Sequence, residues 1–82
     1  MSKVQIRLNL EPLIARKAQE LGKSRLTQQE LAELSGVQQV TLSRWLSNKV
    51  DAYSREILEK LMQTFDCNLE DLFEITVDRT DD

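Results

Sequence analysis

The feature that most constrains this sequence is a pair of small residues, Ala32 and Gly36, set four positions apart between apolar clusters. Two helices that cross steeply at close range need a small side chain where their backbones approach, and Ala32 supplies it. The chain must then turn sharply, and Gly36 can adopt the positive φ that such a turn requires. The apolar residues spaced to hold the two helices on a core are Leu31, Val37, Leu42 and Trp45. The pattern predicts a helix-turn-helix over residues 27–46.

The second helix of this motif is predicted to have a polar outer face. A helix that presents amides, hydroxyls and a guanidinium can read base edges in the major groove of DNA. For Arg44 the alternative is an ordinary solvated residue, and for Val40 the alternatives are a thymine contact and support of the helix. Trp45 is expected in the core. The predicted outward residues are Gln38, Gln39, Thr41, Ser43 and Arg44.

Periodicity predicts one mainly α domain with short strands at its two ends. The first ten residues alternate between apolar and polar, as in a strand with one buried face. Five segments then have helical spacing; one begins near Pro12, and another begins at Thr27, where Glu30 completes a capping-box pattern. The predicted elements are a strand over 3–9, helices over about 11–21, 28–35, 38–46, 55–65 and 69–73, a strand over 74–78 and an acidic tail over 79–82.

The two predicted strands carry complementary charges, Lys3 and Arg7 on the first and Glu74 and Asp78 on the second. Opposite charges across an antiparallel pair contribute about 0.2–1 kcal/mol, so pairing is expected. A two-stranded ribbon is marginally stable alone, and its open edges invite further pairing. We expect a homodimer through the terminal strands, either as a four-stranded sheet across the twofold axis or by strand exchange. The alternative is a ribbon that only closes one subunit.

The composition argues against several classes of function. With no His and a single Cys, the chain lacks the ligands of a zinc site and the side chains of common catalytic arrangements. Neither a metal, a cofactor nor an enzyme activity is therefore expected. The lone Cys67 cannot form an internal disulfide, which suits a reducing cytoplasm. The apolar runs are too short to span a membrane, and we expect a cytoplasmic protein.

The net charge of −3 conceals an asymmetry along the chain. Residues 1–65 carry ten basic and seven acidic side chains, or +3, whereas residues 66–82 carry one basic and seven acidic side chains, or −6. Binding DNA requires basic groups against phosphates, and the mildly basic body is compatible with that. The alternative for the acidic end is that it only aids solubility.

The segment Leu26-Thr27-Gln28-Gln29-Glu30-Leu31-Ala32 resembles the start of the helix-turn-helix in the phage repressor and Cro family. The resemblance covers about residues 10–73, and Leu69-Glu70-Asp71-Leu72-Phe73 resembles the family's closing segment. It implies that Gln28 holds a phosphate at a helix N-terminus, and that Lys49 meets another phosphate. It also implies that the start of the second helix reaches bases and that Arg44 faces the groove; the residues at that start are Gln38, Gln39 and Thr41.

Three departures from the family pattern stand out. Ser35 takes the place of a buried aliphatic residue, and Asn48 takes the place of a Gly, although Asn can adopt the left-handed conformation that ends a helix. Leu34 and Leu46 are apolar where polar residues are common. We expect this pair to pack under the terminal strands; the alternative is a surface for another protein.

Two functions follow as hypotheses. In the first, the chain is a transcription regulator, a repressor that binds a palindromic operator as a dimer. In the second, it is an antitoxin or adaptor whose acidic end binds a basic protein, with DNA binding as autoregulation. Three further residues near the motif, Lys23, Arg25 and Tyr53, could reach the DNA backbone in either case.

Overall fold

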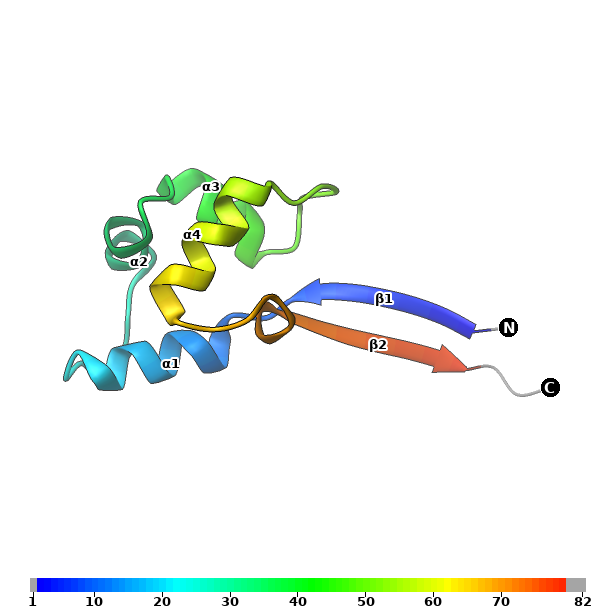
Figure 1. Ribbon diagram of the computed structural model, residues 1–82, viewed down its shortest axis with the longest axis horizontal. Coiled ribbons are helices and arrows are strands. Elements are labelled where there is room, and N and C mark those ends of the chain that lie inside the picture. Colours follow the sequence, from blue (N-terminus) through cyan, green and yellow to red (C-terminus); the bar gives the residue numbers. More distant parts are fainter. Residues whose placement is uncertain (1, 80–82) are drawn as a thin grey trace.

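The computed structural model describes residues 2–79, and it consists of a helical body from which a two-stranded ribbon projects (Figure 1). The molecule is elongated, with extents of 50 × 24 × 20 Å, because the ribbon extends away from the helices. Both described ends of the chain lie at the far end of the ribbon. The elements are β1 (Ser2–Leu8), α1 (Glu11–Glu20), α2 (Gln28–Ser35), α3 (Gln39–Leu46), α4 (Arg55–Phe65), the 3₁₀ turn η1 (Leu69–Leu72) and β2 (Phe73–Arg79).

The prediction of a mainly helical fold with a helix-turn-helix is confirmed, but the count of five helices is wrong. The structure has four α-helices between residues 2 and 79, and the segment predicted as the fifth is a single 3₁₀ turn. The backbone N–H of Asn68 donates to the Asp71 carboxylate at 3.0 Å, which holds this turn at its start. Phe73 already belongs to β2 and pairs with Leu8, so the helix cannot continue.

The predicted boundaries of α2 and α4 agree with the structure. α3 begins one residue later than predicted, because Gln38 has an extended backbone and precedes the first turn. α1 ends at Glu20, one residue earlier than predicted and two residues before Gly22, whose φ is 71°. β1 begins and ends one residue earlier than the predicted 3–9, and β2 extends one residue beyond each end of the predicted 74–78. Of the predicted tail, Arg79 belongs to β2, and residues 80–82 lie outside the described residues.

A core of aliphatic residues and two aromatic rings joins the helices to the base of the ribbon. α1 and α4 are also linked by a hydrogen bond that the Arg16 guanidinium donates to the carbonyl of Phe65. Burial of each such apolar side chain contributes about 1.5–3 kcal/mol, which makes this core the main source of stability. The buried apolar residues are Leu8, Leu10, Leu13, Ala18, Leu31, Val37, Leu42, Trp45, Leu61, Phe65 and Leu72.

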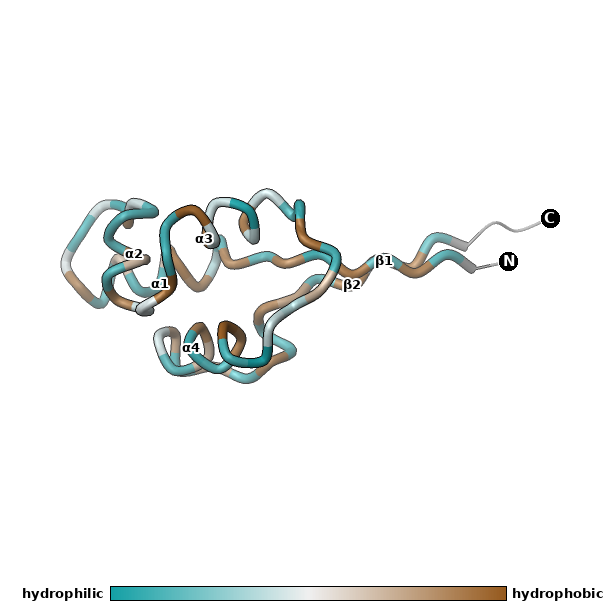
Figure 2. The backbone as a smooth tube through the Cα atoms, turned by 90° about the horizontal axis from the view of Figure 1, so that it is seen from above, coloured by the Kyte–Doolittle hydropathy of each residue, from teal (hydrophilic) through white to brown (hydrophobic). Residues whose placement is uncertain are grey.

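β1 and β2 pair antiparallel within one chain, which confirms the predicted pairing of the two strands. Lys3 lies opposite Asp78, and Arg7 lies opposite Glu74. Apolar and polar residues alternate along both strands (Figure 2). Because successive side chains of a strand point to opposite sides, the ribbon has one polar and one apolar face. Because the two strands of one chain already pair, strand exchange is not needed to form the ribbon.

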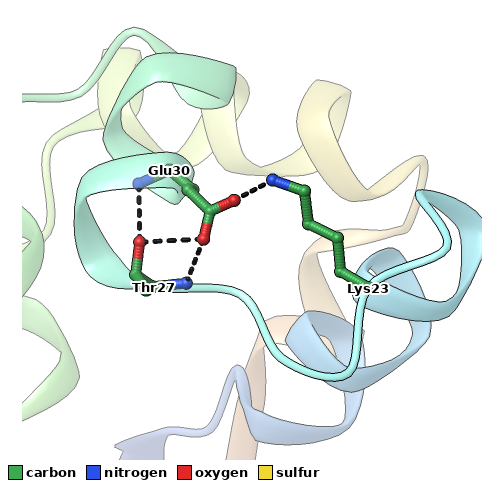
Figure 3. A network of polar contacts seen from close by, with 3 residues as sticks. All are labelled: Lys23, Thr27 and Glu30. Atoms are coloured by element: carbon green, nitrogen blue, oxygen red, sulfur yellow. Dashed lines mark hydrogen bonds and ion pairs between the residues drawn. The ribbon is translucent and has the colours of Figure 1, made fainter.

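α2 starts with the predicted capping box (Figure 3). The hydroxyl oxygen of Thr27 accepts from the Glu30 N–H at 3.1 Å, and the Glu30 carboxylate accepts from the Thr27 N–H at 3.1 Å. The same carboxylate forms an ion pair with Lys23. This cap fixes where the first helix of the motif begins.

Replacing Thr27 by Ala should lower the free energy of unfolding by about 1 kcal/mol, because the Glu30 N–H loses the hydroxyl oxygen that accepts its hydrogen bond. Thr27→Ser keeps the hydroxyl and should lose less than half of that. Urea denaturation at one fixed protein concentration, followed by Trp45 fluorescence, measures both. Equal losses in the two variants would assign the effect to the Thr methyl group and contradict the capping role.

Candidate nucleic-acid interface

α3 is fixed on the body by one face. Leu42 and Trp45, three positions apart, are both buried, which orients the helix about its axis. The ring of Trp45 meets the ring of Tyr53 edge to face, with centroids 5.0 Å apart. Tyr53 makes the same kind of contact with Phe73 of β2 at 5.1 Å. Tyr53 is half-buried in this aromatic series, which does not favour the predicted contact of Tyr53 with DNA.

The opposite face of α3 is exposed. Gln39, Ser43 and Arg44 lie there, as predicted, and Gln38 is exposed at the N-terminal end of the helix. Val40 lies among them and is 70% exposed, so it does not support the helix from inside. Thr41 is half-buried instead, in a shallow groove that also involves Ser54 and Ile57 at the start of α4. We call Gln39, Val40, Ser43 and Arg44 the reading face.

Two further predicted residues flank the reading face in the chain. Gln28 is exposed in the first turn of α2. Within residues 2–79 the backbone N–H groups of Gln28 and Gln29 have no hydrogen-bond partner, so they are free to donate to an anion. Lys49 is exposed in the loop after α3. Both positions are suited to contacts with a phosphate backbone.

The charge around the reading face is favourable for a polyanion. Although the chain contains 14 acidic residues, none lies between positions 34 and 50. Arg44 and Lys49 form no ion pair with any residue in the described part of the chain. Lys23, by contrast, is engaged by Glu30, which leaves the exposed Arg25 as the freer cation before α2. The segment that carries the reading face therefore offers cations and no carboxylate of its own to phosphates. Glu56 of α4, which lines the groove beside Thr41, is paired with Lys60.

Asn48 has a role that the sequence did not reveal. Its φ of 57° confirms the left-handed conformation predicted at the end of α3. Its side-chain oxygen accepts from the Leu8 N–H at 2.8 Å, and its side-chain nitrogen donates to the Leu8 carbonyl at 3.2 Å. These bonds tie the loop after α3 to the last residue of β1. They join residues 40 positions apart, and the sequence signal at this position was only that Asn48 stands where the family has a Gly.

The other departures from the family pattern have local explanations. Ser35 is buried, but its hydroxyl accepts from the Val37 N–H at 3.2 Å, so no polar atom is left unsatisfied there. Leu46 packs against the core beside Leu8, in agreement with the prediction for this pair. Leu34 is 44% exposed, so the prediction that it packs under the strands is wrong. Its position on α2 faces water because Leu31 and Ser35 take the inner face.

No group of His, Cys, Asp and Glu side chains among residues 2–79 has an arrangement that could hold a metal ion. Cys67 is half-buried. Burial raises the pKa of its thiol, the charges of Asp71 and Asp66 act in the same direction, and Arg16 opposes them. A raised pKa keeps the thiol protonated and poorly nucleophilic near neutral pH. No helix in the described part of the chain is long and apolar enough to cross a membrane.

Comparison with known proteins agrees with this geometry. The profile of the Cro/C1-type HTH DNA-binding domain matches residues 18–78, which is most of the chain. The match includes α2, α3, α4 and most of β2. No curated protein and no solved structure gives a significant match.

Replacing Asn48 by Gly should remove the tie to β1 while preserving the backbone, because Gly adopts positive φ without strain. We expect faster hydrogen exchange at the Leu8 amide and a loss of about 1–2 kcal/mol in the free energy of unfolding. Hydrogen exchange measured by NMR tests the expectation for the Leu8 amide. Ser47→Gly, at the neighbouring exposed position, is the control. Unchanged exchange at Leu8 in the Asn48 variant would contradict the assigned hydrogen bonds.

Proposed function

The chain belongs to the Cro/C1-type helix-turn-helix DNA-binding family, and from that premise we propose that it is a sequence-specific transcription regulator that reads double-stranded DNA with α3. The reading face supports this proposal most directly. It combines an amide, a methyl-bearing side chain, a hydroxyl and a guanidinium, all exposed on one side of a helix. These groups complement the donors, acceptors and methyl groups that base pairs present in the major groove.

Each residue of the reading face has a chemical role in this proposal. The Gln39 amide pairs with N6 and N7 of adenine, and the Arg44 guanidinium donates to O6 and N7 of guanine. The Val40 methyl groups contact a thymine methyl, and Ser43 accepts or donates a single hydrogen bond. Gln38 reaches the adjacent base from the N-terminal end of α3, and Thr41 reaches one from the flank beside α4. Each bidentate contact contributes about 1–3 kcal/mol of discrimination.

Phosphate contacts set the register in which α3 enters the groove. Gln28 binds one phosphate through its side-chain amide together with the free N–H groups at the start of α2. Lys49 binds another on the far side of the reading face. These contacts carry affinity but no sequence information, so base contacts must supply the discrimination.

The regulator acts as a repressor in this proposal, by covering DNA that polymerase must occupy. It binds a palindromic operator as a twofold dimer, with half-sites about 34–36 Å apart, one helical turn. The ribbon supports the dimer, since a projecting pair of strands is marginally stable alone and offers surface to a second copy. The modest charge of the chain implies weak non-specific binding, so base contacts carry more of the operator affinity.

The double variant Arg44→Ala, Gln39→Ala should lose the sequence preference of the wild-type chain. A selection from a random duplex library should yield an inverted repeat with wild-type protein and no enriched sequence with the variant. The expected loss on the selected site is about 1,000-fold or more in affinity, from two base contacts in each of two subunits. Enrichment of the same repeat by the variant would exclude these two residues as readers.

Gln28→Ala and Lys49→Ala should instead weaken binding to all sequences by a similar factor, because they contact phosphates. Lys49→Ala should also reduce the slope of log affinity against log salt by about one per subunit. Lys17→Ala, which removes one positive charge from α1, serves as the control and should leave that slope nearly unchanged. A loss confined to particular base pairs in the Lys49 variant would contradict its proposed phosphate role.

A further inference from the structure

We propose that the apolar face of the ribbon, together with a groove at its base, binds the same surface of a second copy of this chain, face to face. The proposal rests on the dimer proposed above and states which surface forms it. The pairing of the strands alone leaves two arrangements open, in which a second ribbon joins at an edge or covers a face. The distribution of side chains on the ribbon separates them.

The two faces of the ribbon differ in polarity. On one face, Lys3 lies opposite Asp78 and Arg7 lies opposite Glu74, so the charges complement each other across the strands and can remain solvated. The other face is apolar, and four of its residues are 49–65% exposed, whereas Leu8 at the base of the ribbon is buried. A patch of neighbouring apolar side chains on a projecting arm is unusual for a protein that remains a monomer. The exposed residues are Val4, Ile6, Ile75 and Val77.

The apolar face continues into an open groove of about 920 Å³ where the ribbon meets the body. Ile6 and Ile75 line the groove from the ribbon, and Tyr53 and Phe73, in edge-to-face contact, line it from the base. Leu69 lies at the same place and is 47% exposed. The ribbon and its base therefore present one continuous surface, with projecting aliphatic side chains at one end and a hollow at the other.

This surface is self-complementary under a twofold axis. If two ribbons face each other in opposite directions, Val4 and Val77 at the tip of one lie over the groove of the other, with Ile6 and Ile75 between. Such an isologous contact places the same patch of each copy against its partner and closes the assembly at two. Packed β faces lie about 10 Å apart, a distance that interdigitating aliphatic side chains fill.

Pairing of two ribbons at their edges would leave their apolar faces exposed to water. Two ribbons joined edge to edge would expose both apolar faces to water, as one patch of twice the size. Face-to-face packing of the two ribbons removes both apolar faces from water. The five exposed apolar residues offer on the order of 100 Å² each, and two copies would remove roughly 1,000 Å² in total, near the lower limit of a specific interface. From Val4 to Leu8 and from Phe73 to Val77, every residue on this face of the ribbon is apolar, so this part of the contact desolvates no charge. Asp51 and Glu70 line the groove at the base of the ribbon.

Ile6→Glu places a charge in the centre of this surface and should raise the dimer dissociation constant by at least about 100-fold. Gln5→Glu places the same charge one residue earlier, on the opposite face, and should have little effect on it. Both positions are exposed, so neither variant disturbs the core. Sedimentation equilibrium without DNA, up to about 100 µM protein, measures the association. Ile75→Glu, opposite Ile6 in the register, repeats the test from β2.

Disulfide trapping distinguishes the two arrangements. In a Cys67→Ser background, a Val77→Cys copy mixed with a Leu69→Cys copy should form the mixed disulfide, because the tip of one ribbon lies over the groove of the other. Gln5→Cys, on the solvated face, should not link to itself. Self-linking of Gln5→Cys without the mixed disulfide would indicate edge addition and overturn the face-to-face arrangement.

Two further outcomes would overturn the proposal. If the wild-type chain stays monomeric up to about 100 µM, the apolar face does not bind a second copy, and its partner is a different protein. If the wild-type chain dimerises and Ile6→Glu does not weaken the dimer, the interface lies elsewhere. Neither outcome bears on DNA reading by α3, which is tested with Arg44 and Gln39. If the proposal holds, Ile6→Glu should still bind a single half-site through α3 but lose the preference for an inverted repeat.

Discussion

The structure depends on the burial of Trp45. This ring fixes the inner face of α3 on the core, and its contact with Tyr53 continues through Phe73 into the ribbon. Because Trp45 and Leu42 occupy one side of a helix of eight residues, the side chains of the reading face have no alternative but to face outward. Asn48 strengthens the same connection through its two hydrogen bonds to Leu8. The reading helix and the ribbon are thus held in one rigid relation.

That relation has a consequence for recognition. A dimer reads a palindrome only if its two reading helices keep a constant separation and angle, and these depend on how each α3 is held against the dimer contact. In this fold the path from α3 to the ribbon is short, and it consists of packed aromatic rings and the hydrogen bonds between the Asn48 side chain and the Leu8 backbone. A dimer contact on the ribbon would therefore fix the separation and angle of the two reading faces with little remaining freedom.

Much of the fold could be predicted because local signals agreed with one another. Thr27, Glu30 and Gly36 marked the ends of α2 through capping and left-handed φ, and each acts as expected. The opposite charges of the two strands indicated that they pair, and the structure pairs them within one chain. The failures have a physical cause as well. The segment after Asn68 begins with a helical cap, but the helix stops because Phe73 belongs to the ribbon. Leu34 was predicted to be packed because it is apolar, but Leu31 and Ser35 occupy the inner face of α2.

The sequence by itself determined the helix-turn-helix, since small residues, caps and apolar spacing act over a few positions and leave one way to fold. It also determined the chemistry available on α3, because the residues not needed for the core are the polar ones. Only the tertiary structure decided that Val40 joins the reading face and that Thr41 turns toward α4. It alone decided the bonds between Asn48 and Leu8 and the continuity of the ribbon with its groove. These depend on contacts between residues far apart in the chain, which no local pattern encodes.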